Sequence, residues 1–133
     1  MNSQIKILLA DESAVFLEQL RHVLERDPAF VIAGSANDAQ RAVELLHRTQ
    51  PDILILDEPT RGIDIGTKTE IQKLVLKLAD EGKSLIFISS EIEEMLRTCN
   101  RMAVLRDGQK VGEIDEADMN QMNVMKAIAG GEQ

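Results

Sequence analysis

The stretch that decides the fold is Ile53-Leu54-Ile55-Leu56-Asp57-Glu58-Pro59-Thr60. Four consecutive apolar residues are typical of a strand that is buried on both faces, as the strands of parallel sheets are. The run ends in two carboxylates and a proline, and Pro rarely continues a central strand. We therefore expect a central parallel strand over residues 53–56 that delivers Asp57 and Glu58 to its carboxyl end.

Strands and helices alternate on both sides of this stretch. Short apolar runs predict strands over residues 5–10, 30–33, 53–56, 84–88 and 102–105. Apolar residues at helical spacing predict helices over residues 16–24, 39–46, 71–78 and 91–98. Each connection is long enough for a right-handed crossover, so the pattern predicts a parallel sheet with helices on both faces.

Five such units suit a flavodoxin-like α/β fold, a three-layer sandwich with sheet order 2-1-3-4-5. The alternative is a displaced fifth strand. Asp107-Gly108 lies between two apolar pairs, which is a hairpin signal. We expect this extra hairpin to be followed by a C-terminal helix over residues 117–129, with three methionines filling gaps in the core: Met119, Met122 and Met125.

Length and composition limit the classes of function. The 133 residues suffice for one domain, and 44% hydrophobic with 29% charged residues is typical of a globular chain. A single cysteine, Cys99, excludes an internal disulfide. A net charge of −8 and 2% aromatic residues oppose nucleic acid as a partner. Without a long apolar run or a signal-peptide pattern, we expect a cytoplasmic protein with no membrane insertion, no specific partner and an undetermined oligomeric state.

The first part of the chain resembles the N-terminal half of a response-regulator receiver domain. The likeness rests on Lys6-Ile7-Leu8-Leu9-Ala10-Asp11-Glu12-Ser13, on Asp27-Pro28, and on Pro51-Asp52-Ile53-Leu54-Ile55-Leu56-Asp57. The resemblance implies a Mg²⁺ site at Asp11, Glu12 and Asp57, with Asp57 as phosphoacceptor. Strands one and three are neighbours in the expected sheet, so these acids should converge. The plainer interpretation is that they are solvated or cap the helices that follow.

From Ile53 onward the sequence resembles the second half of an ABC-transporter nucleotide-binding domain of the sugar-importer type. Residues 53–60 look like a Walker B strand, 61–64 like a D-loop, and 101–113 like the family's strand and hairpin. The resemblance implies that Asp57 and Glu58 are vestigial Walker B residues and that Glu91 replaces the switch histidine. The glycine-rich loop that binds phosphate in this family is missing from the sequence. We therefore expect no ATPase activity and no catalytic residue.

The receiver pattern is incomplete as well. Ser89 or Ser90 stands where receivers carry a hydroxyl after strand four, and Arg106 is near their lysine after strand five. Arg does not reproduce the compact ammonium of Lys, so we treat these residues as vestigial. The expected organisation is one hybrid domain over residues 1–133, receiver-like over 1–56 and ABC-ATPase-like over 57–133.

The chain holds half of each family's active site and the whole of neither. An engineered chimera, made to test whether fragments of two α/β folds share a compatible sheet, accounts for this with fewer assumptions than natural recombination does. We therefore expect a protein that is not an enzyme and has no cofactor other than Mg²⁺. One alternative is a receiver-like signalling module that binds Mg²⁺ and accepts phosphate on Asp57. A third hypothesis is a nucleotide hydrolase that uses Glu58 as general base.

Overall fold

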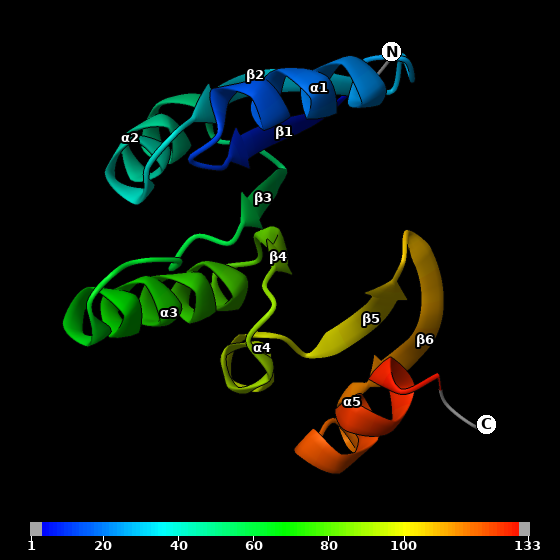
Figure 1. Ribbon diagram of the computed structural model, residues 1–133. Coiled ribbons are helices and arrows are strands. Elements are labelled where there is room, and N and C mark those ends of the chain that lie inside the picture. The colour runs from blue at the N-terminus through cyan, green and yellow to red at the C-terminus, as the bar shows by residue number, and fades with distance from the viewer. Residues whose placement is uncertain (1–3, 131–133) are drawn as a thin grey trace. The chain divides into compact units, whose positions relative to one another are not determined.

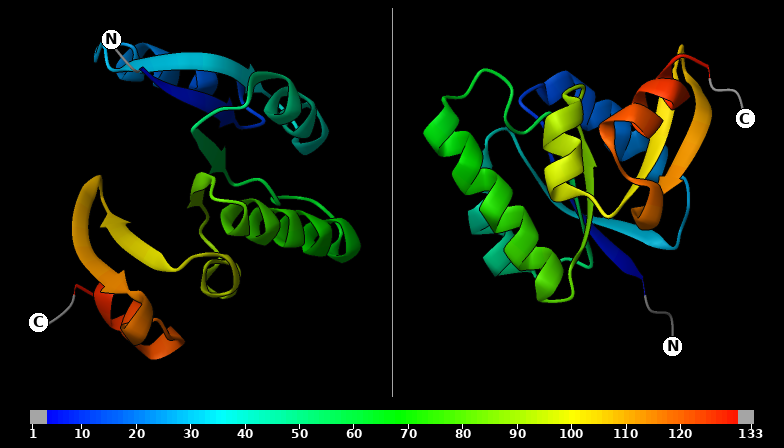
Figure 2. Two further views of the ribbon diagram at one scale, coloured as in Figure 1. Left: turned by 180° about the vertical axis from the view of Figure 1, so that it is seen from behind. Right: turned by 90° about the horizontal axis from the view of Figure 1, so that it is seen from below.

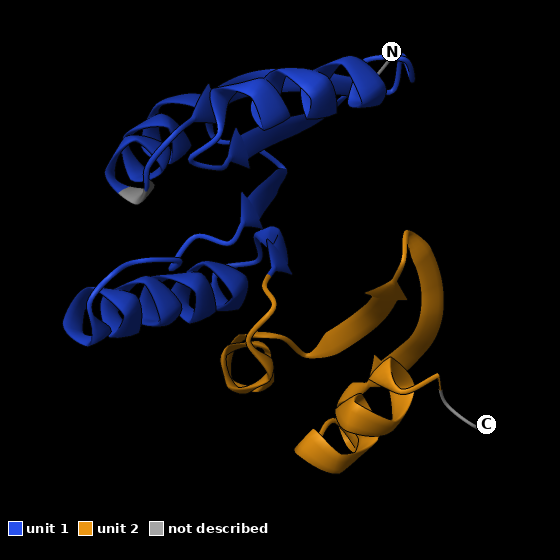
Figure 3. Ribbon diagram, viewed as in Figure 1, with its two compact units in different colours: residues 1–88 blue, residues 89–133 orange. Residues whose placement is uncertain are grey.

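The computed structural model describes residues 4–130 and divides the chain into two compact units, residues 1–88 and 89–133 (Figure 3). This boundary follows Ile88, whereas the two sequence resemblances change over near residue 57. The first unit thus contains the whole receiver-like segment and the first part of the ABC-like segment. That both segments form one hybrid domain stays a prediction.

The first unit is a four-stranded parallel sheet with three helices (Figure 1). The strands are β1 (Ile5–Ala10), β2 (Phe30–Ala36), β3 (Ile53–Asp57) and β4 (Ser84–Ile88). The helices are α1 (Ala14–Leu24), α2 (Ala39–Thr49) and α3 (Ile65–Asp80). The strand order is β2-β1-β3-β4, so the expected α/β fold class and the first four places of the sheet are confirmed.

Each helix of this unit begins at a capping side chain. Ser13, Asp38 and Asp64 each accept a hydrogen bond from the backbone N–H three residues further on. Such caps satisfy a backbone donor that the first helical turn leaves unpaired. Ser13 and Asp64 thus fix where the loops after β1 and β3 end, and the acidic residues of the candidate site lie at the beginning of these loops or at the end of β3.

The side chains of the sheet alternate between two faces, which are covered by helices except at β4, where Ile86 and Ile88 are exposed. On one face, Ile7, Leu9 and Ile55 form a buried cluster with Leu17 of α1. On the other face, Leu54 and Leu56 face α2 and α3. The right-hand view of Figure 2 shows α1 on one side of the sheet and α2 with α3 on the other. Burial of these apolar side chains is the main term that stabilises the unit.

The second unit is built around an antiparallel hairpin. It contains α4 (Ile92–Thr98), β5 (Arg101–Arg106), β6 (Gln109–Asp115), a 3-10 turn (Glu116–Asp118) and α5 (Gln121–Ile128). Asp107 and Gly108 have φ angles of 54° and 77°, as a two-residue type I′ turn requires. The expected hairpin and C-terminal helix are therefore confirmed. In the described part of the chain, no helix has both the length and the apolar character needed to span a membrane.

The fifth place in the parallel sheet was predicted wrongly, because β5 pairs with β6 instead. The strand buries Met102 and Val104 and exposes Arg101, Ala103 and Leu105. This alternation is typical of an antiparallel strand with one covered face, whereas a central parallel strand is buried on both. The two-residue turn supplies β5 with a partner that is adjacent in sequence.

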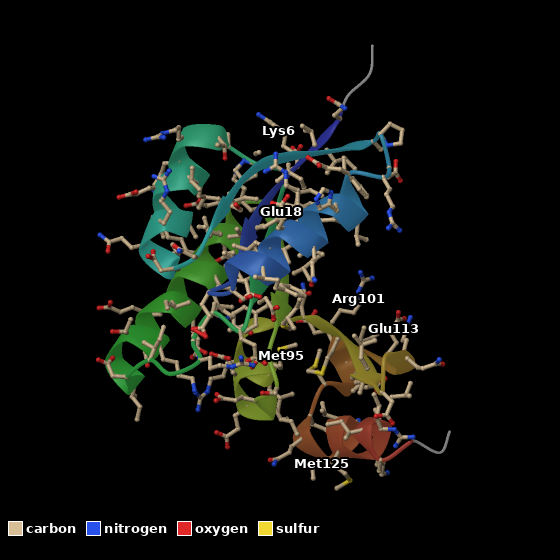
Figure 4. All side chains as sticks on the ribbon, turned by 45° about the horizontal axis from the view of Figure 1, so that its top comes forward. Lys6, Glu18, Met95, Arg101, Glu113 and Met125 are labelled. Atoms are coloured by element: carbon tan, nitrogen blue, oxygen red, sulfur yellow. The ribbon has the colours of Figure 1, made fainter. Side chains whose placement is uncertain are left out.

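The C-terminal helix was expected from residue 117 but begins at Gln121, so Met119 precedes it and only Met122 and Met125 lie on α5. Met119 packs against the buried cluster of Met102, Val104, Ile114 and Val124, as expected. Met122 is 67% exposed and Met125, labelled in Figure 4, is 53% exposed. For these two the expected role in the core is wrong, since α5 turns Val124 inward and places them on other faces of the helix.

Candidate functional site

Asp11 and Asp57 lie next to each other where β1 and β3 end. The parallel register pairs Ala10 with Leu56, so the next residue on each strand is an aspartate. Neighbouring parallel strands present their carboxyl ends at one edge of the sheet, which is where ligands bind in open α/β sheets. The structure thus brings together two of the acids that the sequence singled out. Their role as metal ligands stays a prediction.

The electrostatics of the pair act mainly on Asp57. Partial burial is the largest of the effects that raise the pKa of Asp57 from 3.8 to about 6. A hydrogen bond with the Asp11 side chain and the negative charges of Asp11 and Glu58 raise it further, while Arg61 opposes them. A hydrogen bond between two carboxyl groups requires a shared proton. The pair is therefore a site where a proton, or a cation in its place, relieves repulsion.

The loop after β1 holds Asp11 but leaves Glu12 outside the pair. Asp11 Oδ1 accepts a hydrogen bond of 3.0 Å from the Ser13 N–H, and Asp11 N donates to Ala36 O at 3.1 Å. Glu12 is exposed and is not among the groups that shift the pKa of Asp57. Within residues 4–130, no three His, Cys, Asp or Glu side chains are grouped so as to hold a metal ion. Metal binding by Glu12 stays a prediction.

Glu58 is held by a neighbour that sequence reasoning missed. Its backbone has a φ of 49°, and its N–H donates to Ile88 O at 2.7 Å, which extends the pairing of β3 with β4. Its carboxylate forms an ion pair of 3.2 Å with Arg61. Arg61 is thus the basic group that acts on both Glu58 and Asp57. The sequence signal for this ion pair was the position of Arg61, three residues after Glu58 and directly before a glycine.

The second unit carries the remaining predicted site residues: Ser89, Ser90, Glu91 and Arg106. Ser89 Oγ donates to Glu94 Oε1 and accepts from Glu91 N, each at 3.0 Å. Sequence reasoning missed Glu94, whose side chain is almost fully buried. Ser90 is exposed. Arg106 Nη1 donates to Ile128 O at 3.0 Å, at the end of α5. Ser89 and Arg106 therefore have structural contacts within their own unit.

The architecture of the first unit defines a receiver-like class of fold. The isolated REC domain of RcsB from Salmonella enterica serovar Typhimurium, solved with the phosphomimetic BeF3−, matches with a TM-score of 0.56 and 15% sequence identity. The match covers 71% of this chain and 70% of that one. A second structure, of the Salmonella typhimurium response regulator RcsB, has the same TM-score and 18% identity, over 72% and 47% of the two chains.

Sequence similarity points to a different group of proteins. The fructose import ATP-binding protein FruK of Bifidobacterium longum is 51% identical over 82 residues, which is 61% of this chain and 16% of that protein. A ribose/galactose/methyl galactoside import ATP-binding protein of Geobacillus kaustophilus is 38% identical over 122 residues, 92% of this chain and 23% of that protein. The longer match extends well upstream of β3 at lower identity. No family model matches the chain.

These two findings are consistent with a chimera. The C-terminal part is similar in sequence to sugar-import ATP-binding proteins, and the N-terminal part has the fold of receiver domains. The fusion of two fragments that the sequence predicted is thereby supported. The chain spans less than a quarter of the length of these curated relatives.

The expectation that the chain is not an enzyme is contradicted by the same comparison. Relatives that are 37% to 51% identical in sequence to this chain are import ATP-binding proteins. The expectation rested on a missing phosphate loop, which is one element of such a protein, whereas the similarity extends over as much as 92% of this chain.

Proposed function

We propose that the first unit is a receiver-like module that binds Mg²⁺ at Asp11 and Asp57 and accepts a phosphoryl group on Asp57. The observation that carries this proposal is the position of the two carboxyl groups at the ends of adjacent parallel strands, where Asp11 raises the pKa of Asp57. Two carboxylates held this close repel each other once both are ionised. A divalent cation would bind both oxygens and replace the shared proton.

The donor set fits Mg²⁺. This ion is usually held by one or two carboxylates, with water and phosphate oxygens in the remaining positions. Asp11 and Asp57 supply two such carboxylates at a partly exposed edge. A bound Mg²⁺ would supply positive charge to a phosphoryl group at this edge. Glu12 remains the candidate for a further ligand, directly or through water.

The chain's own residues account for the rest of the proposed reaction. The ionised Asp57 carboxylate attacks phosphorus of a small phosphodonor such as acetyl phosphate, an O–P bond forms to Asp57, and the donor's P–O bond breaks to release acetate. Only the ionised carboxylate is a nucleophile, and with a pKa of about 6 Asp57 is mostly ionised at pH 7.5. The Arg61 guanidinium, which acts on Asp57, favours the approach of an anionic donor.

Amide NMR of the intact chain tests the proposal. We expect Mg²⁺ to shift the amides of residues 10–13 and 56–61 in a saturable way, and beryllofluoride to shift them further only when Mg²⁺ is present. Asp57→Asn should abolish both responses. Asp80→Asn, at the exposed end of α3, is the matched control and should retain both. Absence of any Mg²⁺-dependent shift in the wild-type chain would refute the proposal.

The similarity to import ATP-binding proteins favours a second candidate function, which is ATP binding by the β3 edge and the loop after it. The support is the 51% identity over 82 residues. Glu58, the candidate general base, is paired with Arg61, so a nucleotide would have to compete for that arginine. Calorimetric titration with Mg²⁺ and ATP tests this candidate. Heat that saturates, and that is lost in Glu58→Gln and Arg61→Gln, is the expected result, and no measurable heat would exclude it.

We further propose that the fusion is engineered and that it serves as a test of compatible sheets. The support is that β4 and α3, from the ABC-like segment, complete a sheet begun by the receiver-like segment. A compatible sheet should unfold as one cooperative unit. In urea, probes in β1 and in β4 should report the same midpoint, and separate midpoints would contradict compatibility.

The net charge of −8 supports a function without nucleic acid as partner.

A further inference from the structure

A packing gap lies over β3, between the two helices that cover the same face of the first sheet. Helix α2 contacts β1 and β2, whereas α3 contacts β4, so neither helix is centred on β3. The gap is lined by apolar side chains of α2, of β3 with the loop after it, and of α3: Ala42, Val43, Leu46, Leu54, Leu56, Pro59, Ile71, Leu74, Val75 and Leu78. It therefore lies within one compact unit, on the face of the sheet opposite α1.

The lining of this gap, and not its size, disfavours water as a stable occupant. It leaves about 30 Å³ of room for the centre of a water-sized sphere. By size alone this exceeds the roughly 10–15 Å³ that one water requires. A water molecule also needs two or more polar partners, however, and the residues that line the gap all have hydrocarbon side chains. The gap therefore favours an apolar guest.

We propose that this gap is a binding site for a small apolar guest without hydrogen-bonding groups, the size of a noble-gas atom or a methyl group. An atom placed there gains dispersion contacts with walls that otherwise have no partner on one side. Most of the lining residues are at least nine-tenths buried, while Val43, Pro59 and Leu74 are partly exposed where the gap opens toward the surface. The buried space is far below the 150 Å³ or so of cavities that accept benzene, so it suits a small guest.

Methyl NMR of the intact chain under xenon pressure tests this site. We expect methyl shifts of Leu54 and Val75 to change and to saturate with pressure. The methyl groups of Ile7 and Leu9 pack on the opposite face of the sheet and serve as the internal control. They should show only a small, linear change. No response at Leu54 and Val75, or an equal linear response at all four residues, would overturn the proposal.

Variants that alter the volume of the gap provide a second test of the site. Ala42→Val adds two methyl groups to the wall and should abolish the saturable response. Val75→Ala enlarges the gap and should increase the response, and this variant carries the test if Ala42→Val does not fold. Ile55→Val removes a methyl group on the other face and should leave the response of Leu54 and Val75 unchanged. A response that persists in folded Ala42→Val, or that is lost in Val75→Ala, would place xenon elsewhere and overturn the site.

Discussion

Asp57 lies beside Asp11, because each aspartate directly follows one member of the backbone-paired couple Leu56 and Ala10, and the Asp11 carboxyl group raises the pKa of Asp57. The contact is thus set by the register of β1 and β3, which is fixed by the buried side chains of both strands. Two acids in such a position must share a proton, bind a cation or repel each other. This choice gives the candidate site its dependence on pH and on metal.

Without Mg²⁺, we predict that the chain becomes less stable as the pH rises from about 4 to about 6. The pKa of Asp57 is about 6 in the folded chain and 3.8 in the reference state, so in this window the folded state retains a proton that the unfolded state has lost. The shift is worth at most about 3 kcal/mol, and solvent screening of this half-exposed group reduces it to about 1 kcal/mol. Urea unfolding across this range measures the effect.

The matched variants for this prediction are Asp57→Asn and Asp80→Asn. The first removes the titrating group, so the free energy of unfolding should no longer decrease between pH 4 and pH 6. At pH 7 it should be higher than that of the wild-type chain. The second leaves the pair intact and should follow the wild-type curve. The same pH profile in Asp57→Asn as in the wild-type chain would show that another group is responsible.

Mg²⁺ should stabilise the first unit at pH 7.5. A ligand that binds only the folded state raises the free energy of unfolding with its concentration, by about 1.4 kcal/mol at ten times its dissociation constant. We expect this gain in the wild-type chain and its loss in Asp11→Asn and Asp57→Asn. Denaturant melts with and without Mg²⁺ measure it. An equal gain with Ca²⁺ and in both variants would indicate a general ionic effect instead.

Gly108→Ala should weaken the hairpin of β5 and β6 by about 1 kcal/mol. Gly108 has a φ of 77°, where a side chain is disfavoured, and no atom lies within 4 Å of the added methyl, so the cost comes from the backbone alone. Asp107→Asn keeps the preferred turn residues and serves as the control. Hydrogen exchange of the Arg106 and Gln109 amides, which flank the turn, should accelerate in the first variant and stay unchanged in the second.

Arg106→Gln should loosen the end of α5 without affecting the Mg²⁺ response. The guanidinium donates to Ile128 O, one of the carbonyls that a helix leaves unpaired at its C-terminus. We expect a loss of about 1 kcal/mol in the local stability of this turn, seen as faster exchange of the last amides of α5. If the variant instead abolishes the beryllofluoride response, Arg106 belongs to the phosphoacceptor site.

The parts of the fold that could be predicted are those that short-range patterns determine. Four apolar residues followed by Asp57 identified β3, and Asp107-Gly108 identified the hairpin. The place of β5 could not be predicted, because a short apolar run suits either kind of sheet. The roles of Glu94 and Arg61 were also missed, because both depend on contacts made by the local fold. Glu94 accepts a hydrogen bond from Ser89 at the start of α4, and Arg61 pairs with Glu58 across the loop after β3.

The most direct test of the central claim is a carbon NMR titration of the Asp57 carboxyl group, with and without Mg²⁺. The structure predicts a midpoint near pH 6 without the metal, and a downward displacement once Mg²⁺ is bound, because the cation replaces the proton shared with Asp11. Asp11→Asn should lower the midpoint by itself. A midpoint near 3.8 that is the same with and without Mg²⁺ would contradict the account.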